Sequence, residues 1–177
     1  MWRPKSLKNV LAKNKVLADL TNTSQGGVFV VQTDTVQGWG AWLDDEAGIR
    51  ELMRLKSREL DDSKVFSLVT LGVDLAKYVE LDDFAAKIVA KYGEQPLTLV
   101  LPKNPEFKHW YFDSRVEIGW RTPSTAAMQE LAKRPFLLTS ANERGGTPKS
   151  NGGTPTTVVR IKNDTVEVLR QGDCDIM

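Results

Sequence analysis

Short apolar runs alternate with segments of helical periodicity along most of the chain. A short run of β-branched, aromatic or alternating residues that ends at a polar or proline-containing segment is typical of a β-strand. The strands expected on this basis are residues 27–31, 64–71, 97–101, 115–121 and 136–139. The first ends at the polar turn that begins with Gln32, and Pro102 closes the third.

The segments between these runs carry helix signals. The three expected helices begin at Asp44-Asp45, Asp82-Asp83 and Thr122-Pro123, and they run to Leu55, Ala90 and about Lys133. Carboxylate and hydroxyl side chains cap helix amino termini, and proline suits the first turn. The first of these helices places Lys56 and Arg58 near its carboxyl end.

The last part of the chain reads as a hairpin. Residues 157–161 and 166–169 are expected to pair over residues 162–164, which places Arg170 where the final strand ends. Strands that alternate with helices, followed by a hairpin, indicate an α/β fold with a twisted open mixed sheet and helices on its faces. Neither a repeat nor a linker interrupts the pattern, so residues 1–177 are expected to form a single domain.

Residues 1–15 differ in charge from the rest. They hold five basic and no acidic residues, and Leu7, Val10 and Leu11 recur at helical spacing. We expect a solvated amphipathic helix here. Contact of this helix with RNA or with a partner protein is the alternative.

Composition limits the classes of protein to consider. The 177 residues are 41% hydrophobic, and no apolar run approaches the length of a membrane span. The 24 basic and 23 acidic residues leave a net charge of +1, so an anion site must be local and does not arise from overall charge. No signal-peptide pattern opens the sequence, and its one cysteine cannot form an intramolecular disulfide. We expect a cytoplasmic protein that does not associate with membranes.

Metal and thiol chemistry have little support. Cys174 is the only cysteine and His109 the only histidine, which leaves no Cys/His cluster for a metal and makes a Cys-His nucleophile pair improbable. We interpret both residues as bystanders and predict no metal ligands in the protein.

Three polar loops follow predicted elements, where open α/β sheets usually bind ligands. They are Thr33-Asp34-Thr35 with Gly38 and Gly40, Lys56-x-Arg58, and Thr139-Ser140-Ala141-Asn142. Each has an ordinary structural explanation as a turn, a helix carboxyl terminus or a cap. Each also suits an anionic ligand, because hydroxyl groups, backbone close to glycine, and Lys and Arg side chains bind phosphate oxygens.

The common nucleotide signatures are missing. The sequence has neither a G-x-x-x-x-G-K-[ST] phosphate loop nor a G-x-G-x-x-G after a strand. Ser140 lies outside any G-x-S-x-G, which argues against a hydrolase triad. Lys, Arg, Ser, Thr and Asn without a clear nucleophile favour positioning and charge stabilisation in phosphoryl or nucleotidyl transfer.

In order and spacing, these loops resemble the YrdC/Sua5 family of threonylcarbamoyl-AMP synthases, in its short YrdC form. The matching strings are Thr33-Asp34-Thr35-Val36-x-Gly38-x-Gly40-Ala41, Lys56-x-Arg58, Pro96-Leu97-Thr98-Leu99-Val100-Leu101-Pro102, Arg121-x-Pro123, Thr139-Ser140-Ala141-Asn142 and Arg170-x-Gly172. They span nearly the whole chain.

The resemblance implies a fold, a reaction and partners. It implies a YrdC-like sheet with a basic cavity, and a nucleotidyltransferase that makes threonylcarbamoyl-adenylate from L-threonine, bicarbonate and ATP and releases pyrophosphate. Mg²⁺ would arrive on ATP without dedicated protein ligands. The product would pass to a separate transferase that modifies adenosine 37 of tRNA.

The resemblance also implies residue roles. Thr35, Arg121 and Leu138 would bind threonine, and Arg121 would pair with its carboxylate. The expected ATP-binding residues are Lys56, Arg58, Ser140, Asn142, Ser150 and Arg170, of which Lys56, Arg58, Ser140 and Asn142 are also the expected catalytic residues. Ser150, like Thr147, stands in for a nucleotide-binding serine of the family.

Some positions depart from the family pattern. Gln32 and Gln37 stand where the family usually has proline and tyrosine, and near Ser67 the histidine common in the threonine pocket has no counterpart. Two alternatives therefore stay open. One is a carbamoyl- or adenylate-transfer paralogue with another substrate, such as the YrdC-like module of hydrogenase maturation. The other is an RNA-binding or ribosome-associated module.

Overall fold

The computed structural model describes residues 27–60, 64–142 and 154–176. The helix expected in residues 1–15 lies outside these ranges. Within them, no helix is long and apolar enough to cross a membrane.

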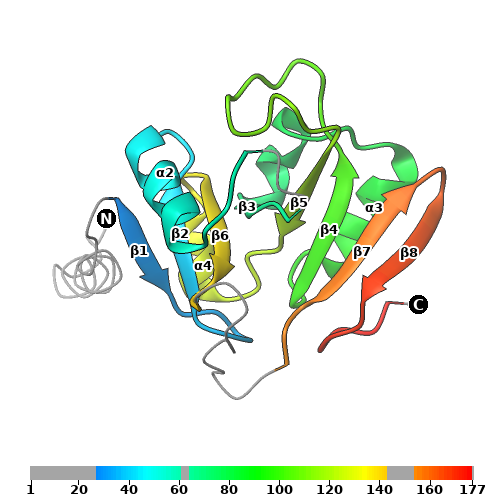
Figure 1. The fold of residues 1–177 in the computed structure, drawn as a ribbon. Helices are drawn as coiled ribbons and strands as arrows, with labels where there is room; N and C mark the ends of the chain where they lie inside the picture. The colour runs from blue at the N-terminus through cyan, green and yellow to red at the C-terminus, as the bar shows by residue number, and fades with distance from the viewer. Residues whose placement is uncertain (1–26, 61–63, 143–153, 177) are drawn as a thin grey trace, which may run out of the picture.

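The described residues form one eight-stranded sheet in the order β1-β2-β6-β3-β5-β4-β7-β8 (Figure 1). The strands are β1 (Val28–Val31), β2 (Gly38–Trp42), β3 (Ser67–Val69), β4 (Leu97–Pro102), β5 (Glu117–Arg121), β6 (Phe136–Ser140), β7 (Thr157–Lys162) and β8 (Thr165–Arg170). The pairs β3/β5 and β4/β7 are parallel and the other five are antiparallel. The expected open mixed sheet of an α/β fold is thus confirmed.

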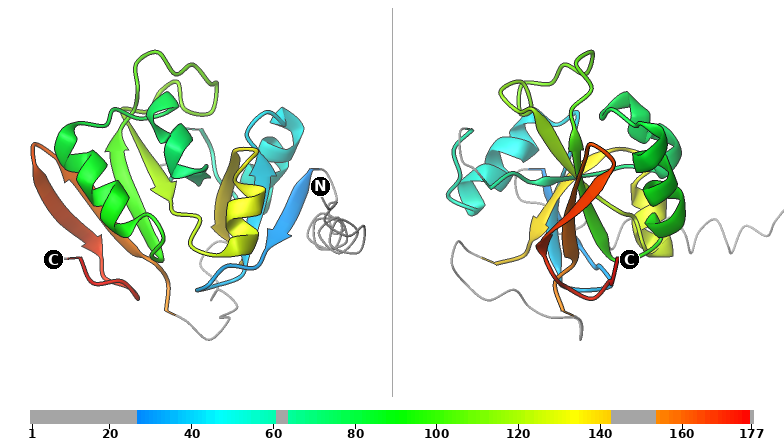
Figure 2. Two further views of the ribbon diagram at one scale, coloured as in Figure 1. Left: turned by 180° about the vertical axis from the view of Figure 1, so that it is seen from behind. Right: turned by 90° about the vertical axis from the view of Figure 1, so that its right-hand side faces the viewer.

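Three α-helices and one 3₁₀ helix lie among the described residues. They are α2 (Glu46–Leu55), η1 (Gly72–Lys77), α3 (Asp83–Tyr92) and α4 (Ala126–Leu131). In the right-hand view of Figure 2, α2 lies on one side of the strands, and α3 and α4 lie on the other. The expected aspartate caps are confirmed, because Asp45 accepts a hydrogen bond from the Gly48 amide at 3.0 Å and Asp82 accepts one from the Ala85 amide at 2.7 Å.

The expected start of α4 is wrong by three residues. Thr125, not Thr122, caps this helix, with its hydroxyl 3.1 Å from the Met128 amide. Thr122 instead continues the sheet, because its amide donates to the Leu97 carbonyl at 3.0 Å and its hydroxyl donates to the carbonyls of Gln95 and Leu97. Pairing with β4 therefore outweighs the local capping signal.

The sequence did not predict strand β2, because the glycines in it suggest a loop. Gly40 lies opposite Phe29 in the register of β1 and β2. A Cβ atom at Gly40 would lie 2.7 Å from the Phe29 ring, so glycine leaves room for this ring to pack against the strand. The glycine serves aromatic packing, where we had expected close approach to a ligand.

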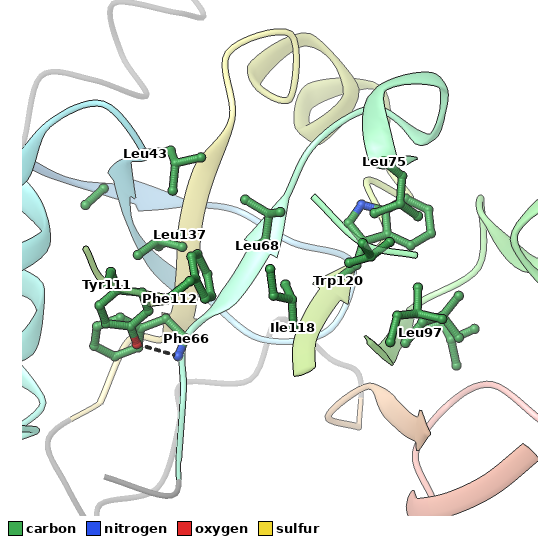
Figure 3. Close-up of a cluster of buried hydrophobic side chains, with 14 of the residues drawn as sticks. Leu43, Phe66, Leu68, Leu75, Leu97, Tyr111, Phe112, Ile118, Trp120 and Leu137 are labelled. Atoms are coloured by element: carbon green, nitrogen blue, oxygen red, sulfur yellow. Dashed lines mark hydrogen bonds between the residues drawn. The ribbon is translucent and has the colours of Figure 1, made fainter. Parts of the chain in front are cut away.

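Two clusters of buried side chains form the core. The larger joins all three layers of the molecule around Leu68 and Trp120, and Figure 3 shows Leu68 between the Phe66–Phe112 group and Trp120. The smaller lies between β1, β6 and α4 and includes Phe29, Phe136 and Met128. Burying apolar side chains is the main favourable term in folding, so these clusters determine how the strands lie.

The strands β4 and β5 present different chemistry on their two faces. Leu99 is fully buried and lies opposite Trp120, which is 1% exposed. The neighbouring pair, Thr98 opposite Arg121, points to the other face because successive side chains alternate along a strand. Packing of one face therefore places the polar side chains of the other.

Candidate functional site

A cavity of about 880 Å³ lies over the polar face of β4 and β5. Its walls come from the turn after β1 and from β2, β3, β6, β7 and β8, together with the chain that precedes β3, β5 and β7. The volume lies in the upper part of the usual range for small-molecule sites.

The cavity is strongly basic. Six of the described residues that line it are basic and one is acidic, namely Arg58, Lys64, Arg115, Arg121, Arg160, Arg170 and Glu117. Since the whole chain is nearly neutral, this excess is local, as expected for an anion site.

The turn after β1 is held by the Thr33 hydroxyl. Thr33 Oγ1 donates to the Val36 carbonyl at 2.5 Å and accepts from the amides of Thr35 and Val36 at 3.2 and 3.1 Å. Thr35 Oγ1 lies 3.2 Å from Thr33 Oγ1, and the residue is almost fully buried at the cavity wall. The turn thus presents the Thr35 hydroxyl in a fixed position.

Arg121 is the most deeply buried charge in the cavity, at 4% exposure. Its NH2 group donates to Asp34 Oδ1 at 2.5 Å, and its NH1 group donates to the carbonyl and the hydroxyl of Thr122 at 2.6 and 3.0 Å. NH1 also lies 3.3 Å from the Ser124 hydroxyl. Burial lowers the pKa of Arg121, and the Asp34 carboxylate opposes this effect.

The sequence did not predict that Asp34 pairs with Arg121, although Asp34 lies in the Thr33-Asp34-Thr35 string. Its second oxygen, Oδ2, accepts from the Ser124 hydroxyl at 2.5 Å. Asp34 and Ser124 are far apart in sequence, and only the fold brings them together behind Arg121.

Lys56 lies directly after α2 and is only 3% exposed. Its ammonium donates to the carbonyls of Ser140 and Asn142 at 3.0 and 2.5 Å and lies 3.2 Å from Asn142 Oδ1. Neither Lys56 nor Asn142 is among the residues that line the cavity. In this structure the pair holds the chain after β6, and direct contact of either residue with phosphate stays a prediction.

Arg58, two residues after Lys56, does line the cavity. The Arg58 guanidinium lies 4.9 Å from the centre of the Phe66 ring, and Phe66 stacks on Tyr111 with 5.5 Å between ring centroids. Figure 3 shows the Tyr111 hydroxyl directed at the Phe66 amide, from which it accepts a hydrogen bond at 2.9 Å. A planar guanidinium over an aromatic face is favourable and limits the orientations of the side chain.

Ser140 and Arg170 both line the cavity. Ser140 is the last residue of β6, and Arg170 is the last residue of β8. The Arg170 guanidinium donates to the Thr156 carbonyl at 3.0 and 2.8 Å, and burial lowers its pKa. The expected nucleotide-binding Ser150 lies outside the described residues.

The remaining expected residues are also placed. Leu138 lines the cavity from β6, opposite Ser67 of β3. His109 and Cys174, interpreted as bystanders, are not among the lining residues; His109 Nε2 lies 2.8 Å from the Leu43 carbonyl. Among the described residues, no three His, Cys, Asp or Glu side chains come close enough to hold a metal ion.

Arg160, which lines the cavity, has two acidic partners that the sequence did not predict. Arg160 lies 3.1 Å from Glu117 and 2.9 Å from Glu167. Glu117 is on β5 and Arg160 on β7, so this contact depends on the strand order and leaves no local signal in the sequence.

Comparison with known proteins identifies relatives that match most of the chain. The model of the Sua5, YciO and YrdC family, described as "Telomere recombination", matches residues 21–151. A putative threonylcarbamoyl-AMP synthase of Methanocaldococcus jannaschii is 27% identical over 184 residues, which cover 90% of this chain and 87% of that protein.

Solved structures share the fold. The crystal structure of Escherichia coli YciO has a TM-score of 0.70 and 23% identity, and the match covers 97% of this chain and 94% of that one. The structure of Pyrococcus abyssi Sua5 complexed with L-threonine has a TM-score of 0.69 and 21% identity, and the match covers 91% of this chain and 54% of that one.

The lowered pKa of Lys56 predicts how the stability of the protein depends on pH. Burial, together with the nearby charge of Arg58, lowers its pKa from 10.5 to about 8. Between these values the unfolded chain binds the proton more strongly than the folded chain, so the free energy of unfolding should rise with pH through this window. We expect this rise to be larger in the wild type than in Lys56→Met by about 1 to 3 kcal/mol.

Denaturant unfolding of both proteins at several pH values between pH 7.5 and 10.5 measures the difference. The variant controls for all other titrating groups. Equal pH slopes in the two proteins would show that Lys56 does not titrate in this range.

Proposed function

Because the chain belongs to the Sua5, YciO and YrdC family, we propose that it is a threonylcarbamoyl-AMP synthase, a nucleotidyltransferase that acts in tRNA modification. The observation that carries the proposal is the cavity itself. It joins a buried arginine suited to a carboxylate with a set of cations and hydroxyls suited to a triphosphate. Relatives named as synthases of this type and a Sua5 structure holding L-threonine support it.

The amino acid is assigned to the end of the cavity formed by Arg121, Thr35 and Leu138. Arg121 pairs with the carboxylate through parallel N–H groups, a geometry that a guanidinium offers and an ammonium does not. The Thr35 hydroxyl offers a hydrogen bond, and Leu138 offers an apolar contact for a methyl group. Ser67 lines the same part of the cavity, at the place where the family histidine is missing.

ATP is assigned to the basic surface that Arg58, Ser140 and Arg170 contribute. Guanidinium groups bind phosphate oxygens through charge-assisted hydrogen bonds. Lys56 and Asn142 support this surface by holding the carbonyl end of β6, which keeps Ser140 at the wall. Ser150 remains a proposed ATP-binding residue on the sequence string alone.

The chemistry has two balanced steps. The threonine amine combines with bicarbonate to give a carbamate and water. A carbamate oxygen then attacks the α-phosphorus of ATP, a new P–O bond forms, and the bond to the β-phosphate oxygen breaks to release pyrophosphate. The protein positions the carbamate and the triphosphate in line and stabilises the negative charge of the departing group with its cations.

Mg²⁺ is proposed to enter with the triphosphate. Among the described residues, Glu117 is the one carboxylate that lines the cavity, and it is engaged with Arg160; Asp34, which lies behind the wall, is engaged with Arg121. Neither fits the role of a dedicated metal ligand, whereas a triphosphate supplies oxygen ligands of its own. The ion adds charge neutralisation on the leaving pyrophosphate.

The partners follow from the product. A mixed carbamic-phosphoric anhydride is reactive, so we propose that it is taken up directly or soon after release by the transferase that the family resemblance implies, which acts on adenosine 37 of tRNA. Direct RNA contact by this chain is a separate alternative, in which the basic cavity serves as a binding surface.

The first test is product formation. Pure protein incubated with ATP, Mg²⁺, bicarbonate and L-threonine should yield threonylcarbamoyl-adenylate and pyrophosphate, detected by mass spectrometry. Heavy-carbon bicarbonate should raise the mass of the product by one unit, because the carbonyl carbon comes from bicarbonate. Tight binding of tRNA with a steep salt dependence and no adenylate product would favour the RNA-binding alternative.

The second test concerns Arg121. Arg121→Ala should raise the KM for threonine by roughly ten- to a hundredfold, because losing a charged hydrogen-bonded contact costs about 1.5 to 3 kcal/mol. Arg121→Lys should restore this only in part. ATP affinity, measured by calorimetry without threonine, should barely change.

Arg134→Ala is the matched control, since Arg134 pairs with Asp44 at 2.7 Å on the exposed surface. Loss of ATP binding in Arg121→Ala, or threonine saturation equal to that of the wild type, would remove Arg121 from the amino acid pocket.

A further inference from the structure

The hydrogen bonds that hold the Arg121 guanidinium come from its NH1 and NH2 groups. The NH1 group is surrounded by three acceptors, the Thr122 carbonyl, the Thr122 hydroxyl and the Ser124 hydroxyl, and NH2 donates to Asp34. Among the described residues, none accepts a hydrogen bond from its Nε. A guanidinium has five N–H donors in a fixed plane. The contacts account for both NH1 hydrogens and one NH2 hydrogen.

The side from which Asp34 approaches decides which donors are left. The Ser124 hydroxyl lies 3.3 Å from NH1 and donates to Asp34 Oδ2 at 2.5 Å. Asp34 therefore reaches NH2 from the side of NH1. The hydrogens that remain are those of Nε and of NH2 on the Nε side, which are parallel and form the fork that binds a carboxylate through two hydrogen bonds.

Asp34 also sets the charge at this end of the cavity. A guanidinium that is 4% exposed is costly to bury alone, and the carboxylate partly offsets that cost. The Asp34–Arg121 pair is neutral as a unit, so the remaining N–H donors suit a single carboxylate, while the pair adds no net positive charge that would favour a polyanion such as pyrophosphate. Arg121 lines the cavity and Asp34 does not, so the carboxylate acts from behind the arginine.

We infer that Asp34, held by Ser124, is a positioning residue that orients the Nε edge of Arg121 toward the cavity and makes this subsite selective for a single carboxylate, as in an α-amino acid. The assignment of the carboxylate to threonine rests on the proposed function. The orientation of Arg121 does not rest on the proposed function, since it follows from the hydrogen bonds of its guanidinium group alone.

The test compares Asp34→Ala and the nearly isosteric Asp34→Asn with Asp44→Asn. Asp44 is a matched control because it also pairs with an arginine, at 2.7 Å, but on the exposed surface. Asp34→Ala should raise the KM for L-threonine about tenfold or more with a smaller effect on kcat, since the carboxylate fork loses its fixed orientation. Asp34→Asn keeps an acceptor for NH2 and should recover part of the loss.

Charge gives a readout that a structural role alone does not move. Asp34→Asn leaves the Arg121 charge uncompensated, so inorganic pyrophosphate should bind several-fold more tightly than to the wild type in calorimetry at low salt. Asp44→Asn should leave both pyrophosphate affinity and the KM for threonine unchanged.

An NMR measurement keeps this inference separate from the proposed function. The Arg121 Nε–H signal, assigned by its loss in Arg121→Ala, should be sharp in the wild type and in Asp34→Asn and broadened in Asp34→Ala. If the wild type makes no adenylate and threonine does not shift this signal, the proposed function fails, while the comparison of variants still decides the role of Asp34.

The inference is overturned if Asp34→Ala keeps both the wild-type KM and a sharp Nε–H signal. Should Asp34→Ala fail to fold, Asp34→Asn and Ser124→Ala decide the matter. Ser124→Ala removes the hydroxyl that holds Asp34 Oδ2 and should raise the KM about threefold. The inference is also overturned if both Asp34→Asn and Ser124→Ala show the wild-type KM for threonine and the wild-type affinity for pyrophosphate.

Discussion

The two-residue period of β4 and β5 is the constraint on which the site depends. On one face of these strands Leu99 and Trp120 are buried in the main core. On the other, Thr98 and Arg121 are paired in register and border the cavity. A shift of either strand by one residue would expose the core side chains and bury the polar ones on the wrong face, so the hydrophobic packing that stabilises the fold also fixes the position of Arg121.

Lys56 and Arg121, the buried cations in the described part of the chain, are stabilised in different ways, and their surroundings explain what each does. Arg121 has a carboxylate partner, which lets a charged group remain at the cavity wall with one edge open to a ligand. Lys56 has carbonyl and amide oxygens around it and no carboxylate within hydrogen-bonding distance among the described residues, and its pKa falls to about 8. The first arrangement suits binding of an anion, and the second ties α2 to the end of β6.

The sequence was most informative where local signals and burial agree. The apolar runs of β4 and β6 and the aspartate caps of α2 and α3 were predicted because local preference and tertiary packing act in the same direction. Strand β2 and the start of α4 were not, because contacts with distant residues override the local signals. Gly40 belongs to a strand because Phe29 packs over it, and Thr122 belongs to the sheet because Leu97 pairs with it.

The same division applies to the site. Thr35, Arg58, Arg121, Ser140 and Arg170 were selected from motif strings and Leu138 from the family resemblance, and all of them line one cavity. The pairing of Asp34 with Arg121 and Ser124, and that of Glu117 with Arg160, could not be predicted, because each joins residues whose proximity depends on the strand order. The strings select residues that line the cavity, whereas the partners that orient those residues become visible only in the fold.

The proposed reaction requires that one cavity hold an amino acid and a nucleotide side by side. A crystal structure of the protein with L-threonine and a non-hydrolysable ATP analogue tests this most directly. We expect the threonine carboxylate on the Nε edge of Arg121, with Asp34 still on NH2, and the triphosphate along Arg58, Ser140 and Arg170. An amino acid bound away from Arg121, or a triphosphate that occupies the Arg121 end of the cavity, would contradict it.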